Sequence, residues 1–203
     1  MAGRHNAPTT GATRDDGPAG PLLRTGLLLG IGIAGFVDEA IFHQLLQWHP
    51  FYWATDQHGR ILSDGFFHSA STLALLWGAF RLWRGDATWR PPRRRVILAG
   101  LLCGAGGFNA YDGLVQHVIF HLHLVNEHVC PTLNNGANSI LTCRADIPYE
   151  VVWLAVALTA LGAGIALWRR ARAFAPLATA HTAGGDGPGH AIHARDRQRG
   201  KKG

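Results

Sequence analysis

The chain has 203 residues, of which 47% are hydrophobic and 16% are charged, and its formal net charge is +6 at pH 7. This length allows one medium-sized domain or a small helical membrane protein. The basic residues sit at the ends of apolar segments with no nucleic-acid recognition element beside them, so we expect no nucleic-acid partner.

Four apolar segments follow one another along the chain. Segment 21–49 begins apolar and turns polar in its second half, and segment 96–125 does the same. Segment 65–83 is interrupted only near its ends, and segment 151–168 carries no charge. A run of about 18 apolar residues is long enough to cross a bilayer. The pattern therefore predicts an all-α domain of four transmembrane helices in residues 21–170. A soluble protein with buried helices is the alternative, which the uniformly apolar fourth segment disfavours.

The arginine residues predict how the chain is oriented. They cluster in the N-terminal tail, in the loop between the second and third segments, and after the fourth segment, whereas the other two loops contain only Arg60 and Arg144. Because loops rich in Arg and Lys stay in the cytoplasm, we predict that both termini are cytoplasmic. The loops at about 50–64 and 126–148 then face outward.

The cysteines lie in different environments. Cys130 and Cys143 fall in the second outward loop, while Cys103 lies within the third apolar segment and is expected to pack there. A cysteine pair on the oxidising side of the membrane can form a disulfide, so we predict a Cys130–Cys143 bond; two free thiols or a copper-binding pair are the alternatives. The tails, 1–20 and 171–203, are polar and predicted to be disordered.

One pattern of polar residues occurs twice. The stretches GFVDEAIFHQLLQWH and GFNAYDGLVQHVIFHLH both begin with Gly-Phe and contain Asp-x4-His-x5-His. The pattern is made by Asp38, His43 and His49 in the first stretch and by Asp112, His117 and His123 in the second. Each stretch is followed by an outward loop and a helix that opens on an acid, with Asp64-x3-His68 in one case and Asp146-x3-Glu150 in the other.

This repetition predicts a four-helix bundle built from two duplicated helical hairpins, at about 21–84 and 96–170. Both hairpins start in the cytoplasm, so the repeat is a parallel one, related by a pseudo-two-fold axis along the membrane normal. At about 100° per residue, Asp38 and His43 of an α-helix point about 140° apart. Either a wide polar arc facing the bundle interior or a local π-bulge would bring them together.

The predicted topology gathers the polar residues in the outer half of the bundle. Ionisable residues within spans mark functional sites, and imidazole and carboxylate are ligands for transition metals. The predicted metal ligands are Asp38, His43, His49, His68, Asp112, His117, His123 and Glu150. Residues predicted to support them from a second layer are Glu39, Gln44, Gln47, Asp64, Gln116, His121 and His128.

These residues predict an integral membrane metal-binding protein. Copper is the first choice of metal because the site is rich in histidine and near the oxidising side, and non-haem iron is the second. Such a centre would serve redox chemistry, as a metal-dependent membrane oxidoreductase, or metal handling for respiratory enzymes. The expected partners are the lipid bilayer and a respiratory oxidase or metal chaperone, and homo-oligomer formation stays open.

Three alternatives compete with this interpretation. The first is a b-type haem electron-transfer protein, with His43 and His117 as axial ligands and the glycines of the first and third segments making room for the porphyrin. Close helix packing is the commoner cause of such glycines. The second is a lipid-modifying di-iron enzyme, since HVIFHLH resembles one desaturase-type histidine box. The third is a metal-free polar network or proton path.

The motifs GFVDEAIFHQLLQWH, SDGFFHS and FNAYDGLVQH resemble those of a bacterial family of predicted four-span membrane proteins, domain of unknown function 2243. The likeness covers about residues 25–168, and it implies a multi-pass protein of the bacterial inner membrane without implying an activity. Glu39 replaces the glycine that usually follows the aspartate in this pattern, and the second outward loop, with its cysteine pair, is longer.

Overall fold

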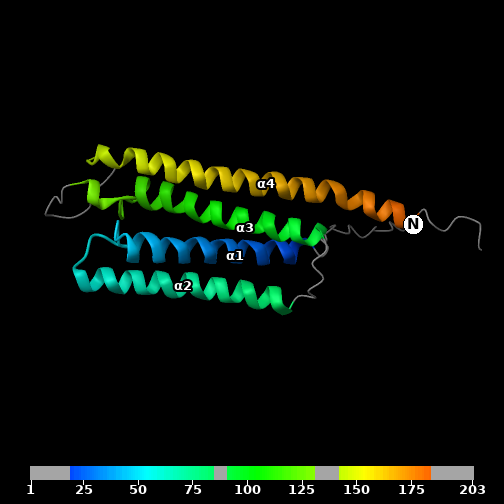
Figure 1. Ribbon diagram of the computed structural model, residues 1–203, viewed down its shortest axis with the longest axis horizontal. Helices are drawn as coiled ribbons and strands as arrows, with labels where there is room; N and C mark the ends of the chain where they lie inside the picture. Colours follow the sequence, from blue (N-terminus) through cyan, green and yellow to red (C-terminus); the bar gives the residue numbers. More distant parts are fainter. Residues whose placement is uncertain (1–18, 85–90, 131–141, 184–203) are drawn as a thin grey trace, which may run out of the picture.

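The computed structural model describes residues 19–84, 91–130 and 142–183, and these residues form helices and no strand. Four long helices are connected by short helical turns (Figure 1). The long helices are α1 (Ala19–Asp38), α2 (Gln57–Arg84), α3 (Pro91–Tyr111) and α4 (Ile147–Ala183). Two π-helical segments, η1 (Glu39–Leu45) and η2 (Asp112–Ile119), extend α1 and α3, and two 3₁₀ turns, η3 (Glu127–Val129) and η4 (Arg144–Asp146), precede α4.

The prediction of an all-helical fold with four helices is confirmed, but the helices lie in one row rather than in a closed bundle. Their order across the row is α2, α1, α3 and α4 (Figure 1). Helices α1 and α3 form the central pair, α2 packs mainly on α1, and α4 packs mainly on α3. Phe67 of α2 also stacks on Phe108 of α3, with ring centroids 5.9 Å apart. The π-helical ends of α1 and α3 both lie at the end of the row where α2 and α4 begin.

Glycines hold the central pair at close range. A Cβ atom added to Gly26 or Gly30 of α1 would overlap backbone atoms of α3, and one added to Gly100 or Gly104 of α3 would overlap backbone atoms of α1. This is the small-residue packing that lets membrane helices approach closely. The space beside these four glycines is therefore filled by the backbone of the neighbouring helix.

The outer helices are attached in the same manner. Gly32 of α1 lies against the backbone of Leu75 in α2, and Gly106 of α3 lies against the backbone of Leu161 in α4. Gly100, Gly104 and Gly106 follow Gly26, Gly30 and Gly32 by 74 positions, the same separation as between Asp38 and Asp112. The two hairpins thus use equivalent glycines for equivalent contacts.

Two helices are long and apolar enough to cross a membrane, Ala19–Leu45 and Arg144–Ala173. Large apolar side chains are exposed along the outer helices, for example Leu73 and Trp77 of α2 and Val152 and Val156 of α4. Helix α4 continues to Ala183, past the boundary predicted at residue 170. Most of the predicted tails, residues 1–18 and 184–203, lie outside the described residues.

The glycine contact predicts opposite effects for two alanine substitutions in α3. Gly104→Ala is expected to lower the free energy of unfolding by about 1–3 kcal/mol, because the methyl group would overlap the Leu27 carbonyl oxygen of α1. Gly107→Ala is the matched control, because no atom lies within 4 Å of its added Cβ and alanine favours the helix by about 1 kcal/mol. Thermal unfolding in detergent measures both, and equal melting temperatures would contradict this packing.

Candidate metal centre

Both aspartates of the repeat mark the point where an α-helix becomes a π-helix. Residues Glu39–Leu45 and Asp112–Ile119 adopt this wider form, which turns the chain by a smaller angle per residue than an α-helix. The aspartate and the histidine five residues later therefore share one face. His43 Nε2 lies 3.6 Å from Asp38 Oδ2, and His117 Nε2 lies 3.1 Å from Asp112 Oδ2. Of the two arrangements that the sequence left open, the structure has the π-helical one.

The chain reverses just after each π-helix. Gln47 and His121 adopt the left-handed backbone conformation, with φ of 51° and 52°. Residues other than glycine rarely adopt this conformation. Equivalent backbone hydrogen bonds fix the reversal, from Trp48 N to Phe42 O at 2.8 Å and from Leu122 N to Gln116 O at 2.9 Å. This turn directs the histidine two positions after the left-handed residue, His49 or His123, back toward the π-helix that precedes it.

The four histidines meet in one buried cluster. None has a side chain that is more than a few per cent exposed. Ring centroids are 4.6 Å apart within each hairpin, between His43 and His49 and between His117 and His123. Across the hairpins His49 stacks on His123, also at 4.6 Å. The two diagonal separations, 6.3 Å and 6.1 Å, are nearly equal, as a two-fold relation between the hairpins requires.

The Nδ1 atom of each histidine has an acceptor at its side. His43 Nδ1 lies 3.2 Å from Asp64 Oδ1, and His117 Nδ1 lies 2.7 Å from Glu150 Oε2. The other two Nδ1 atoms face backbone carbonyl oxygens. His49 Nδ1 lies 2.7 Å from Val125 O, and His123 Nδ1 lies 3.4 Å from Leu124 O. Such partners hold the proton on Nδ1 and leave the lone pair on Nε2.

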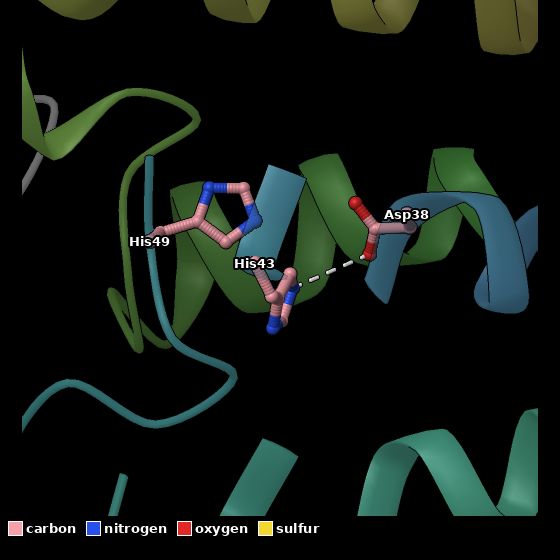
Figure 2. A group of neighbouring side chains, drawn as sticks. All are labelled: Asp38, His43 and His49. Atoms are coloured by element: carbon pink, nitrogen blue, oxygen red, sulfur yellow. Dashed lines mark ion pairs between the residues drawn. The ribbon is translucent and has the colours of Figure 1, made fainter. Parts of the chain in front are cut away.

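The Nε2 atoms, in contrast, are buried without a hydrogen-bond partner in all four histidines, as are Asp38 Oδ1 and Asp112 Oδ2. Two of these Nε2 atoms have an aspartate oxygen beside them at ion-pair distance, His43 from Asp38 at 3.6 Å (Figure 2) and His117 from Asp112 at 3.1 Å. Buried polar atoms in proteins are normally paired, so an unpaired set calls for an explanation. A metal ion supplies one, because neutral imidazole and carboxylate are its ligands and hydrogen-bonded Nδ1 atoms are the usual support of histidine ligands.

The donor atoms form two equivalent groups. In Asp38, His43 and His49, one donor atom from each residue lies within 4.8 Å of the others, and the same holds for Asp112, His117 and His123. Among the residues that the structure describes, no such group contains all four histidines. The arrangement therefore offers two neighbouring cation positions rather than one position with four imidazole ligands.

The charges of the cluster also favour cations. Five carboxylates surround the imidazoles, those of Asp38, Glu39, Asp64, Asp112 and Glu150. Within the described ranges, no Arg or Lys forms an ion pair with any of these carboxylates. A buried, uncompensated negative charge is costly unless a cation or a proton neutralises it.

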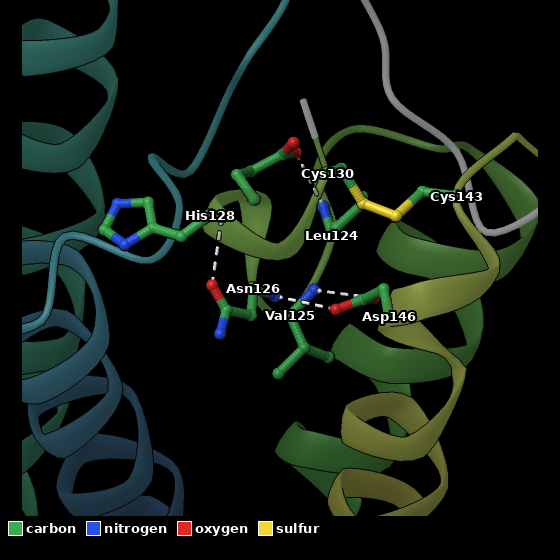
Figure 3. The surroundings of a disulfide bond; sticks show 8 residues. Leu124, Val125, Asn126, His128, Cys130, Cys143 and Asp146 are labelled. Atoms are coloured by element: carbon green, nitrogen blue, oxygen red, sulfur yellow. Dashed lines mark hydrogen bonds between the residues drawn. A yellow bond between two sulfur atoms is a disulfide. The ribbon is translucent and has the colours of Figure 1, made fainter. Parts of the chain in front are cut away.

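Two further aspartates anchor the loops that carry the second histidines. Asp64 Oδ1 accepts a hydrogen bond from Phe51 N at 2.6 Å. Asp146 accepts from Val125 N at 3.2 Å and from Asn126 N at 2.9 Å (Figure 3). Phe51 and Val125 each lie two residues after a clustered histidine. The matched helix openings of the repeat therefore serve this anchoring role, which was not predicted from the sequence.

Comparison with known families shows which family the chain belongs to. A profile of predicted membrane proteins, designated DUF2243, matches residues 25–171. The chain belongs to the DUF2243 family. No curated protein and no solved structure showed significant similarity to it. The family description assigns membrane location by prediction and no activity, so the chemistry of this DUF2243 protein has to be argued from its own residues.

The predicted disulfide of this DUF2243 protein is confirmed. Cys130 and Cys143 are bonded (Figure 3), and both half-cystines pack with Leu124 next to the cluster. The loop that they close, 131–141, lies outside the described residues. Cys103 is half-buried and has a free thiol against Gly164 of α4, in accordance with the expected packing role.

The prediction that His68 is a ligand is not supported by its position. Its side chain is exposed on α2, and its ring lies beside Phe36 at 5.5 Å. The reason is that Glu39, predicted only as a supporting residue, already occupies the place beside His43, with Oε2 3.2 Å from His43 Nδ1. In the second hairpin the helix residue equivalent to His68, Glu150, takes that place.

The other predicted supporting residues differ in their positions. Gln44 donates a hydrogen bond to Glu39 Oε1 at 2.7 Å, and Gln116 is buried beside His117. His121 lies outside the cluster with its ring 3.0 Å from the His117 carbonyl oxygen. Gln47 and His128 are exposed, so their contribution to the site is confined to the backbone.

The anchoring role of Asp146 can be tested by substitution. Asp146→Ala is expected to lower the free energy of unfolding by about 1–3 kcal/mol, because two buried N–H groups lose their acceptor. Ser69→Ala is the control, since the Ser69 hydroxyl makes only an exposed hydrogen bond to the Gly65 carbonyl oxygen within α2. Thermal unfolding of the purified protein checks the difference, and similar melting temperatures for the two variants would argue against the anchor.

Proposed function

We propose that this protein is a four-span integral membrane protein that holds two metal ions between its hairpins, one at each Asp/His/His group. The observation that carries the proposal is the set of four buried Nε2 atoms without hydrogen-bond partners. They converge on a small volume together with two aspartates, and each imidazole is held from behind through Nδ1. This is the preorganisation that a metal site requires.

The four-span topology is supported by the row of helices. Family membership and two strongly apolar helices place the chain in a membrane. Helices α2 and α3 lie alongside these two and are of comparable length, so they cross the same layer. Arg81, a charged residue in the last part of α2, donates a hydrogen bond to the Thr25 hydroxyl at 3.2 Å. The arginine distribution then predicts cytoplasmic termini in the bacterial inner membrane.

The outward location of the centre is supported by the disulfide. The Cys130–Cys143 disulfide packs with Leu124 (Figure 3), the residue that follows His123 in the sequence. Disulfides persist on the oxidising side of the membrane. The metal centre accordingly faces the non-cytoplasmic side, with both hairpin loops above it.

The donor set suits divalent transition metals. Imidazole nitrogen with carboxylate oxygen matches Cu(II), Fe(II) and Zn(II), while Cu(I) favours thiolate and thioether ligands. Two divalent ions also offset most of the five negative charges. Copper, or failing that non-haem iron, would support redox chemistry or metal transfer to a respiratory enzyme. A haem is disfavoured because most of the glycines on the facing surfaces of α1 and α3, among them Gly26, Gly30, Gly100 and Gly104, pack against the backbone of the neighbouring helix.

Elemental analysis of the purified protein tests the proposal. We expect about two metal ions per chain, and a loss of at least one of them in His43→Ala or His117→Ala. His68→Ala is the matched control, because this exposed imidazole lies outside both donor groups. A metal-free wild-type protein, after expression in metal-supplemented medium, would favour a bare polar network, and a haem absorption spectrum would favour the haem alternative.

The topology is tested by cysteine labelling in spheroplasts. Gln57→Cys, at the exposed start of α2, is expected to be labelled from outside by a membrane-impermeant maleimide. Arg84→Cys, at the opposite end of α2, is expected to react only after permeabilisation. The reverse labelling pattern would overturn the orientation, and labelling of both sites from one side would overturn the four-span topology.

A further inference from the structure

We infer that Glu39 makes the two metal positions inequivalent, so that the position in the first hairpin binds a divalent cation first and more tightly than the position in the second. This inference rests on the proposed metal centre and adds to it an order of occupation and the residue that sets it.

The comparison starts from the separation of 74 residues that relates the hairpins. It pairs Asp38 with Asp112, and the next residue, Glu39, with Gly113. The aspartates and histidines are therefore conserved between the two halves, whereas the residue directly after the aspartate changes from a carboxylate to no side chain at all. Together with Glu150 in place of His68 on the second helix of the hairpin, this difference changes which carboxylates enter the donor cluster.

The contacts explain why the second hairpin has glycine. A Cβ atom on Gly113 would lie 2.9 Å from Glu150 Oε1 and 2.8 Å from Leu154 Cδ2. Glu150 of α4 reaches over this glycine to place Oε2 2.7 Å from His117 Nδ1. In the first hairpin the carboxylate comes instead from the π-helix, since Glu39 Oε2 lies 3.2 Å from His43 Nδ1.

The first hairpin keeps an additional acid as a result. His43 is surrounded by Asp38, Glu39 and Asp64, at 3.6, 3.2 and 3.2 Å, whereas His117 is surrounded by Asp112 and Glu150 alone. Asp146, the counterpart of Asp64, instead accepts hydrogen bonds from two backbone N–H groups through its two carboxylate oxygens. Donor atoms of Glu39, His43 and Asp64 also lie within 4.8 Å of one another, a grouping without a counterpart among the described residues of the second hairpin.

The extra charge is buried and is not neutralised by a hydrogen bond at the oxygen that faces the histidine. Glu39 is 1% exposed, and its Oε2 has no hydrogen-bond partner, while Oε1 accepts from Gln44. One additional negative charge several ångströms from a bound cation, at the effective dielectric of a protein interior, is expected to raise affinity by about 10- to 100-fold. The first hairpin should therefore fill first.

Titration with Co²⁺ alone tests this order. The full-length protein is purified in detergent, stripped with a chelator, and followed by visible absorption and by calorimetry. We expect wild-type protein to bind Co²⁺ in two steps whose affinities differ by about 10- to 100-fold. In Glu39→Gln the tighter step is expected to weaken until the two steps merge, and Glu39→Gly, which reproduces the residue of the second hairpin, is expected to do the same.

Glu150→Gln is the matched control, because it removes the equivalent carboxylate from the second hairpin. It is expected to weaken the looser step and to widen the gap between the two. Circular dichroism establishes that each variant is folded. Two equal steps in the wild type, or a tighter step that Glu39→Gln leaves unchanged, would overturn the inference while leaving the metal centre intact. Absence of Co²⁺ binding to the wild type would overturn the metal centre together with it.

Discussion

Backbone contact between α1 and α3 is the constraint on which the site depends. Because glycines face each other along this contact, the two helix axes approach closely enough for the chain segments beyond them to meet. The π-helical ends then stand side by side, and the rings of His49 and His123 stack at 4.6 Å. Side chains in place of these glycines would separate the helices and, with them, the two halves of the histidine cluster.

The same separation of 74 residues recurs along α1 and α3 and through the turns that follow them. It relates the packing glycines, the aspartates at which the π-helices begin, the four histidines, the left-handed residues and the anchored loop residues. Agreement of packing, backbone conformation and polar contacts points to one hairpin design used twice. Exceptions to the repeat are accordingly informative, and Glu39 against Gly113 is the exception closest to the candidate ligands.

The polar cluster is expensive to bury, and the surrounding structure limits that cost in three ways. Carboxylates and carbonyl oxygens hold each Nδ1, aspartates hold the loop backbone, and the disulfide with Leu124 covers the second loop. None of these contacts satisfies the Nε2 atoms. Most of the unsatisfied buried side-chain atoms in the described part of the chain belong to the histidines and carboxylates of the cluster, with Thr72 and Gln116 as the exceptions, which is why a cation accounts for the arrangement better than a hydrogen-bond network.

The sequence by itself determined the four helices, the disulfide and the repeat, because hydrophobic length, cysteine placement and polar spacing are local properties of the chain. It did not determine that the helices form a row, since that follows from which glycine faces meet. Nor did it decide whether Glu39 or His68 contacts His43. Glu39 follows the first aspartate and His68 lies in the first turns of α2, and only their positions in space show that Glu39 is the one that reaches His43. The π-helical turn that unites each aspartate with its histidine was likewise a tertiary outcome, because an α-helix of the same sequence would point them apart.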